Sequence, residues 1–153
     1  MPSVHIVYAS SSGHTQYVVD HLCVYLRGKG ISDIEVQIAE RATAEDLARG
    51  DVLILGSGTW NTGGIEGQLN PHMHELLLRR AKDVDLSGKK ATLIALGDER
   101  YYYTARAGEH LRHFLHTQGA EIVCDPLTIV NEPYGQEEKI ENWGANFVTS
   151  MNQ

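Results

Sequence analysis

The chain has 153 residues, of which 42% are hydrophobic and 22% charged, with only four prolines. This length is typical of one domain, and the composition excludes a disordered or collagen-like chain, so we expect a single domain over residues 1–153. Thirteen Lys and Arg against twenty Asp and Glu give a net charge of −7. Such an acidic chain lacks the basic surface that binds nucleic acid or an anionic membrane, and it suits a protein partner with a basic surface.

Neither the start of the chain nor its cysteines indicate export or a metal site. Residues 1–8 contain no basic segment followed by a long apolar run, which excludes a typical signal peptide, and no apolar run is long enough to span a bilayer. Cys23 and Cys124 are about a hundred positions apart, a spacing that fits neither a disulfide framework nor a zinc site. We therefore expect a soluble, cytoplasmic protein, and separately we expect it to be a monomer.

Strand and helix patterns alternate along the first half of the chain. Val4–Tyr8 predicts a first strand, and apolar residues at helical spacing predict a helix over residues 15–27. The alternating pattern of Ile34–Ile38 is typical of an edge strand. The continuous apolar runs at residues 52–55 and 91–96 are typical of strands that helices cover on both faces.

The second half continues this alternation. Its predicted elements are a helix over residues 67–81 with Pro71 in the first turn, the strand at 91–96, a helix over 104–118, a fifth strand over 121–130 broken near Pro126, and a helix over 136–151. The pattern predicts an α/β fold on an open, doubly wound parallel sheet. Ligands bind such sheets beyond the carboxyl ends of the strands, so the candidate site comprises the loops at residues 10–15, 56–64 and 97–104.

The loop after the first strand reads Ser10-Ser11-Ser12-Gly13-His14-Thr15. It opens onto a helix N-terminus, where free N–H groups and the helix dipole favour an anion, and its glycine lets the backbone approach a ligand. Because the loop has no Lys or Arg, hydroxyls and amides alone would hold a phosphate, which suits a permanently bound group better than one that is transferred. The alternative is an ordinary N-cap built from small turn residues.

Residue types in these loops exclude several familiar sites. A nucleotide-hydrolysing P-loop needs Gly-Lys-Ser/Thr, a dinucleotide fingerprint needs three glycines, a thiol phosphatase needs a cysteine nucleophile, and a hydrolase elbow needs Gly-x-Ser-x-Gly. A phospho-accepting receiver needs acidic residues where Ser10 and Gly58 stand. What remains is a neutral loop suited to a bound phosphate.

The loop over residues 56–64 contains no charged residue and carries Trp60 among glycines and small polar residues. Because no predicted strand or helix buries Trp60, we expect its large aromatic ring to stack on a flat ligand. Trp143 is different, because it lies in register with Ile140 and Phe147 and is expected in the core. The alternative for Trp60 is packing over the neighbouring helix.

The third loop begins Gly97-Asp98 and contains three consecutive tyrosines at residues 101–103. Three adjacent rings cannot all be buried on one side, so at least one faces the crevice; the alternative is a tyrosine cluster packed against the adjacent helix. Asp98, at a strand end, can accept a hydrogen bond from an imide-type N–H. Together the three loops describe a slot for a flat heterocycle with a phosphorylated tail.

With these motifs the chain resembles the flavodoxins, small electron carriers that bind flavin mononucleotide (FMN). The similar motifs are Ser10-x-Ser12-Gly13-x-Thr15 for the family's phosphate loop, Thr59-Trp60 for its tryptophan loop and Gly97-Asp98-x-x-Tyr101 for its third loop. The resemblance covers essentially the whole chain, and the short segment between Gly119 and Tyr134 resembles the short-chain branch. It implies a flavodoxin-like three-layer sandwich with five parallel strands in the order 2-1-3-4-5.

The resemblance also implies a role for each matching residue. Trp60 and Tyr101 would flank the isoalloxazine ring, Asp98 would accept from its N3–H, and Tyr103 would touch its edge. Asn61 stands where the family often has glycine, at the peptide that turns to accept a hydrogen bond from the reduced flavin. The full set of expected FMN-binding residues comprises a phosphate loop (Ser10, Ser11, Ser12, Gly13, His14, Thr15), a tryptophan loop (Gly58, Thr59, Trp60, Asn61, Thr62, Gly63) and a third loop (Leu96, Gly97, Asp98, Tyr101, Tyr103).

The implied function is low-potential transfer of single electrons between redox proteins on non-covalently bound FMN, with no catalytic residues of the chain's own. Asp98, Glu99 and the overall negative charge would disfavour the anionic reduced flavin and so lower its potential. Two alternatives stay open: a flavin-dependent quinone or NAD(P)H reductase on the same fold, and an accessory protein of this fold without FMN. Consumption of NAD(P)H would favour the first, and a failure to bind FMN the second.

The histidines do not predict a metal site. His110, His113 and His116 recur every third residue, and successive steps of about 300° carry them around the helix. His72 and His74 are two residues apart and face different sides of theirs. We expect these side chains on solvated faces, and both cysteines as core fillers.

Overall fold

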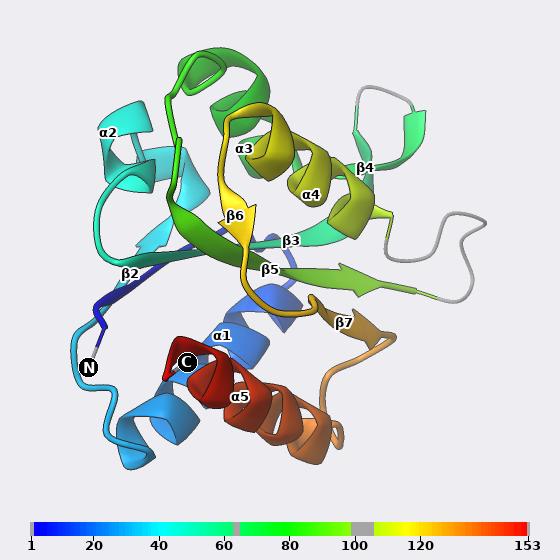
Figure 1. The fold of residues 1–153 in the computed structure, drawn as a ribbon. Coiled ribbons are helices and arrows are strands. Elements are labelled where there is room, and N and C mark those ends of the chain that lie inside the picture. Colours follow the sequence, from blue (N-terminus) through cyan, green and yellow to red (C-terminus); the bar gives the residue numbers. More distant parts are fainter. Residues whose placement is uncertain (1, 63–64, 99–105, 153) are drawn as a thin grey trace.

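The computed structural model describes residues 2–62, 65–98 and 106–152. A parallel sheet forms the middle layer, with helices packed on both of its faces (Figure 1). The strands are β1 Val4–Tyr8, β2 Ile34–Ile38, β3 Val52–Thr62, β4 Ile65–Leu69, β5 Lys90–Gly97, β6 Glu121–Ile122 and β7 Leu127–Val130. The helices are α1 His14–Gly28, a 3₁₀ turn η1 Ala39–Arg41, α2 Ala44–Leu47, α3 Pro71–Glu75, a π-helical turn η2 Leu76–Arg80, α4 Ala107–Thr117 and α5 Glu137–Met151.

The strand order confirms the predicted doubly wound sheet. The parallel strands lie in the order β2-β1-β3-β5-β6, and β7 pairs with the carboxyl half of β5. Because β6 and β7 are the two pieces of one strand position, interrupted before Leu127 where Pro126 lies, the order equals the predicted 2-1-3-4-5. Thr92 of β5 spans the interruption, since its hydroxyl donates to the Cys124 carbonyl at 3.3 Å.

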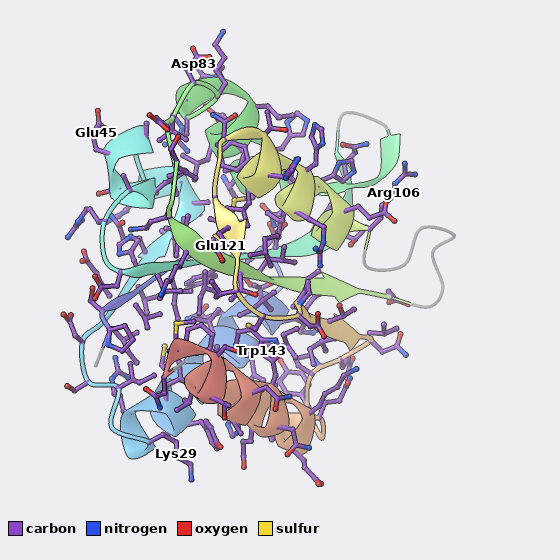
Figure 2. All side chains as sticks on the ribbon, viewed as in Figure 1. Lys29, Glu45, Asp83, Arg106, Glu121 and Trp143 are labelled. Carbon is purple, nitrogen blue, oxygen red and sulfur yellow. The ribbon has the colours of Figure 1, made fainter. Side chains whose placement is uncertain are left out.

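Alternate side chains of the central strands pack into two hydrophobic cores, one on each face of the sheet. On one face, Ile6 and Ile54 pack with side chains of α1 and α5; on the other, Val7 and Leu53 pack with those of α3, η2 and α4. This explains the continuous apolar runs, because both faces of these strands are buried. Trp143 of α5 is buried against the sheet as predicted, and its indole N–H donates to the Asp125 carbonyl at 2.6 Å (Figure 2).

The prediction of a loop over residues 56–64 is wrong for residues 56–62. β3 continues past Gly58, beyond its pairing with β5, and acquires β4 as an antiparallel partner, with Trp60 opposite Gln68. The sequence contains a signal for this hairpin, because a Gly63-Gly64 pair precedes the alternating residues 65–69. Trp60 therefore lies on a paired strand, with 37% of its surface exposed.

The helix predicted over residues 67–81 begins later, at Pro71, because residues 67–69 belong to β4. Asn70 caps it by accepting the His72 N–H at 3.0 Å, and Pro71 occupies the first turn as predicted. The helix ends in the π-helical turn η2, where Ala81 N–H donates to the Leu76 carbonyl.

Three other helices lie close to their predicted ranges, with α1 at 14–28, α4 at 107–117 and α5 at 137–151. The short elements η1 and α2 were not predicted, since each has four residues or fewer and too little periodicity to be recognised. No helix in the described ranges is long and apolar enough to cross a membrane.

Candidate cofactor site

The loop between β1 and α1 has the geometry of an anion site. The Ser10 hydroxyl accepts the Gly13 N–H at 3.1 Å and the Gln16 N–H at 3.4 Å, which folds the loop over the start of α1. Gly13 has a φ of 90°, a left-handed conformation that favours glycine. The 15-residue helix α1 starts directly afterwards and has no acidic residue in its first turn.

Four backbone N–H groups in this loop have no acceptor among the residues that the structure describes: those of Ser11, Ser12, His14 and Thr15. They surround the N-terminus of a long helix, whose dipole adds to their partial positive charge. Neutral N–H and O–H donors without a basic residue fit a phosphate monoester that stays bound. The loop predicted from sequence therefore provides the donors that an FMN phosphate needs.

The start of α1 lies directly against β3. A Cβ placed on Gly56 would come 3.6 Å from the Thr15 side chain, so the glycine permits this close packing, and Thr15 is buried. A Cβ on Gly58 would come within 3.1 Å of the Trp60 indole nitrogen. Trp60 thus lies over the Gly58 backbone, and the predicted phosphate and tryptophan segments meet at the carboxyl end of the sheet.

Asn70 holds these segments together, and sequence reasoning missed it. Its side-chain N–H donates to the Ser11 hydroxyl at 3.0 Å, and its backbone N–H donates to the Ser57 hydroxyl at 3.0 Å. Asn70 is fully buried although it caps α3. The Asn-Pro pair at a helix start was the signal that could have identified it as a cap, but not its contact with Ser11.

The third loop begins at the carboxyl end of β5. Leu96 is buried opposite Gly58, and the Thr59 hydroxyl donates to the Leu96 carbonyl at 2.9 Å while accepting the Ala107 N–H at 3.0 Å. Gly97 and the half-buried Asp98 follow at the same edge. Thr59 therefore joins β3, β5 and the start of α4.

Some predicted site residues have limited or no description. The backbones of Asn61 and Thr62 lie in β3, where the pairing with β4 shifts register between Trp60 and Thr62, and such irregularities are common next to binding sites. Gly63, Tyr101 and Tyr103 lie outside the described residues, as does Glu99. Their roles stay predictions.

An aromatic cluster borders the phosphate loop. The His14 ring meets Tyr134 edge-on at 5.6 Å between centroids, and Tyr134 meets Tyr17 at 4.8 Å. Burial and the neighbouring Glu137 raise the pKa of Tyr17, so it stays a neutral phenol near pH 7. Sequence reasoning missed Tyr17 and Tyr134, because their contact joins α1 to a segment far away in sequence.

The other histidines of the described ranges do not gather around a metal. No group of three or more His, Cys, Asp or Glu side chains that could hold an ion occurs there. His110 instead bonds the Gly67 carbonyl at 2.8 Å through Nε2. Cys23 is buried as expected, whereas Cys124 is only half-buried, so its prediction as a core filler is only partly correct.

Comparison with known proteins shows the family to which the chain belongs. The family model for flavodoxin matches residues 6–143. The flavodoxin of Nitratidesulfovibrio vulgaris is 30% identical over 154 residues, which cover 99% of this chain and 100% of that protein. The structure of oxidised flavodoxin 2 from Bacillus cereus has a TM-score of 0.86 at 30% identity, covering 96% of this chain and 98% of that one.

A flavodoxin from Fusobacterium nucleatum, solved with flavin mononucleotide bound, has a TM-score of 0.77, covers 97% of this chain and 98% of that one, and at 17% identity supports the fold alone. The family model nevertheless covers most of the chain and includes the phosphate loop, the tryptophan segment and the end of β5. The chain therefore belongs to the flavodoxin family, whose members are FMN-binding electron-transfer proteins and not enzymes.

Proposed function

We propose that this flavodoxin holds the FMN phosphate on the four backbone N–H groups of Ser11, Ser12, His14 and Thr15. The observation that carries the proposal is that these donors lack acceptors among the described residues although they crowd the N-terminus of a 15-residue helix. Hydroxyls of Ser10 and Ser12 and the Thr15 side chain complete the neutral cradle. Bound FMN supplies the one-electron chemistry, and the chain positions it and tunes its potential.

We propose that the isoalloxazine ring binds at the carboxyl ends of β3 and β5. Trp60 supplies an aromatic face that is still partly exposed, and Asp98 supplies an acceptor at the edge of the sheet. In this proposal Tyr101, which lies outside the described residues, covers the second face of the ring. Thr59 joins the two strands through its bond to Leu96 and joins them to the start of α4 through its bond to Ala107.

The acidity of the chain has two roles in this proposal. No Lys or Arg lies among the proposed FMN contacts, and the net charge is −7, so the anionic reduced flavin is disfavoured and its potential is low. The same charge attracts a basic-surfaced redox partner. Electron transfer to such a partner should slow steeply as salt rises; a flat salt dependence would contradict this role.

The proposed unit is residues 1–153 as one monomeric domain of the cytoplasm. The match to flavodoxins favours a carrier over a quinone or NAD(P)H reductase. Fluorescence titration of FMN with the apoprotein tests the proposal. We expect quenching that saturates at one FMN per chain, and no NAD(P)H consumption by the holoprotein alone. Absence of quenching would instead support an accessory protein without flavin.

A further inference from the structure

A cavity lies between residues of the α3–η2 segment and α4, beside β4. Figure 1 shows these elements on the same face of the sheet. Its volume is about 230 Å³. The lining residues are Gln68, Leu69, His74, Leu77, Leu78, Lys82, His110, His113, Phe114, Thr117 and Gln118. None of them belongs to the predicted FMN set, although Gln68 and Leu69 of β4 pair with Trp60 and Thr59 of β3.

Hydrogen bonds hold the walls of this cavity at both ends. At one end, His110 of α4 bonds the Gly67 carbonyl of β4 at 2.8 Å. At the other, the Gln118 side-chain N–H group donates to the carbonyls of Lys82 and Val84, at 3.0 and 2.6 Å. The cavity is therefore formed before any ligand arrives, which lowers the entropy lost on binding.

The lining combines an apolar floor with basic groups. Leu69, Leu77 and Phe114 are buried and form the floor. Lys82 and His113 lie at its exposed side, and the lining contains no Asp or Glu. The Lys82 ammonium and the His113 ring make no hydrogen bond or ion pair with any residue in the described part of the chain.

The backbone is unusual at the same place. η2 is a π-helical turn, in which Ala81 N–H reaches back five residues to the Leu76 carbonyl. Such turns are rare and occur frequently at functional sites. This turn places Leu77 on the cavity floor and leaves Leu78 at the mouth with 56% of its surface exposed.

We propose that this cavity binds a small amphipathic anion, with a compact hydrophobic body on Leu69, Leu77 and Phe114 and one carboxylate at Lys82 and His113. In a chain of net charge −7, a lining without carboxylates selects for an anion locally. Its volume lies between that of a cavity that admits benzene and that of a drug-sized pocket, which fits a bicyclic ring.

The test is a titration of the FMN-saturated protein with 2-naphthoate, followed by NMR. We expect saturable shifts in η2 and α4 and none at residues 10–15. The neutral isostere 2-naphthamide should bind at least about tenfold more weakly, because it lacks the charge that Lys82 meets. Equal affinity of the two probes, absence of saturable shifts, or shifts confined to the flavin loops would each overturn the proposal.

Matched variants sharpen the test. Lys82→Gln should weaken 2-naphthoate about tenfold and leave 2-naphthamide unchanged. Lys29→Gln removes the same charge on the far side of the molecule, beyond α1, and should change neither (Figure 2). An unchanged affinity of Lys82→Gln for 2-naphthoate would overturn the assignment. Because the two sites share no residue, either result leaves the FMN proposal intact.

Discussion

At the amino end of β5, the Lys89 ammonium donates to three backbone carbonyls, those of Ala48, Arg49 and Gly50. At the carboxyl end of β1, four backbone N–H groups meet no acceptor in the part of the chain that the structure describes. Both edges gather polar backbone groups at the end of a helix. At the amino end of β5 the backbone groups find a partner within the chain, whereas at the carboxyl end of β1 they are available to a ligand.

On the β1–β2 side of the sheet, polar side chains also form hydrogen bonds with one another. The buried His5 bonds Gln37 at 2.7 Å, Gln37 donates to Asp46 at 3.2 Å, and Asp46 accepts from Arg49 at 3.0 Å. Arg49 also bonds Glu35, whose carboxylate lies 3.6 Å from the buried His5 Nδ1, an atom that makes no hydrogen bond with any described residue. The comparison indicates that the paired side chains on the β1–β2 side stabilise the fold, whereas the backbone N–H groups of residues 11, 12, 14 and 15 are available to a ligand.

Among the variants, the largest expected effect is on FMN affinity in Asn70→Asp. The aspartate keeps the α3 cap but loses the N–H that holds Ser11, and it places a buried negative charge beside the phosphate loop. We expect the Kd for FMN to rise about 30-fold, equivalent to about 2 kcal/mol. Titration of FMN fluorescence measures it, with urea unfolding of the apoprotein as the control. An unchanged Kd would show that Asn70 does not organise the site.

Lys89→Met removes the ammonium that caps the carbonyls at the end of α2. We expect about 1.5 kcal/mol less stability in urea unfolding and no change in FMN affinity, because the change lies at the opposite edge. Lys90→Met is the matched control. The Lys90 side chain is exposed and makes no such bonds to carbonyls in the described ranges. Equal losses in both variants would refute the capping role.

Gly13→Ala and Gly88→Ala form a pair of glycine variants with similar backbones. Both glycines have positive φ, 90° and 75°, and neither has an atom within 4 Å of an added Cβ. Strain should lower the stability of each by about 1 kcal/mol. Only Gly13→Ala should also weaken FMN binding, by about tenfold. If Gly88→Ala weakens it equally, the effect is general destabilisation.

The smallest expected effect is the dependence of stability on the ionisation of Asp46 at acid pH. Partial burial opposes ionisation of Asp46, but hydrogen bonds from Thr43, Arg49 and Gln37 prevail and lower its pKa from 3.8 to about 2. A lowered folded-state pKa adds stability above the unfolded value and loses it as pH falls from about 4 to about 2. Solvent screening limits this contribution to about 1 kcal/mol.

Urea unfolding between pH 5 and pH 2 checks this expectation. Asp46→Asn should flatten the loss of stability in that window, whereas Asp83→Asn, at an exposed position seen in Figure 2, should follow the parent protein. Identical curves for Asp46→Asn and the parent would remove Asp46 from the account of acid stability.

The sheet could be predicted because its signals are local. Continuous apolar runs marked β3 and β5 as central strands, and Pro126 marked the interruption before β7. The β3–β4 hairpin was missed because its small polar and glycine residues also suit a loop, although the Gly63-Gly64 pair was a signal for it; the pairing of Trp60 with Gln68 shows the hairpin.

The site divides in the same way. Ser10 and Gly13 could be predicted because a helix N-terminus and its loop are adjacent in sequence. Asn70 could not, because its bond to Ser11 spans 59 residues. The contact of His14 with Tyr134 likewise depends on the fold and on no local pattern.

The proposal that the carboxyl end of β1 binds a phosphate, unlike the amino end of β5, is tested most directly by comparing FMN with riboflavin, which lacks the phosphate. Parallel titrations of the apoprotein should show FMN binding at least about 100-fold more tightly, equivalent to about 2.7 kcal/mol, since only FMN has a phosphate for the backbone N–H groups of residues 11, 12, 14 and 15. Gly13→Ala should reduce this preference. Equal affinity for the two flavins would contradict the account, because the open edge would then not be a phosphate site.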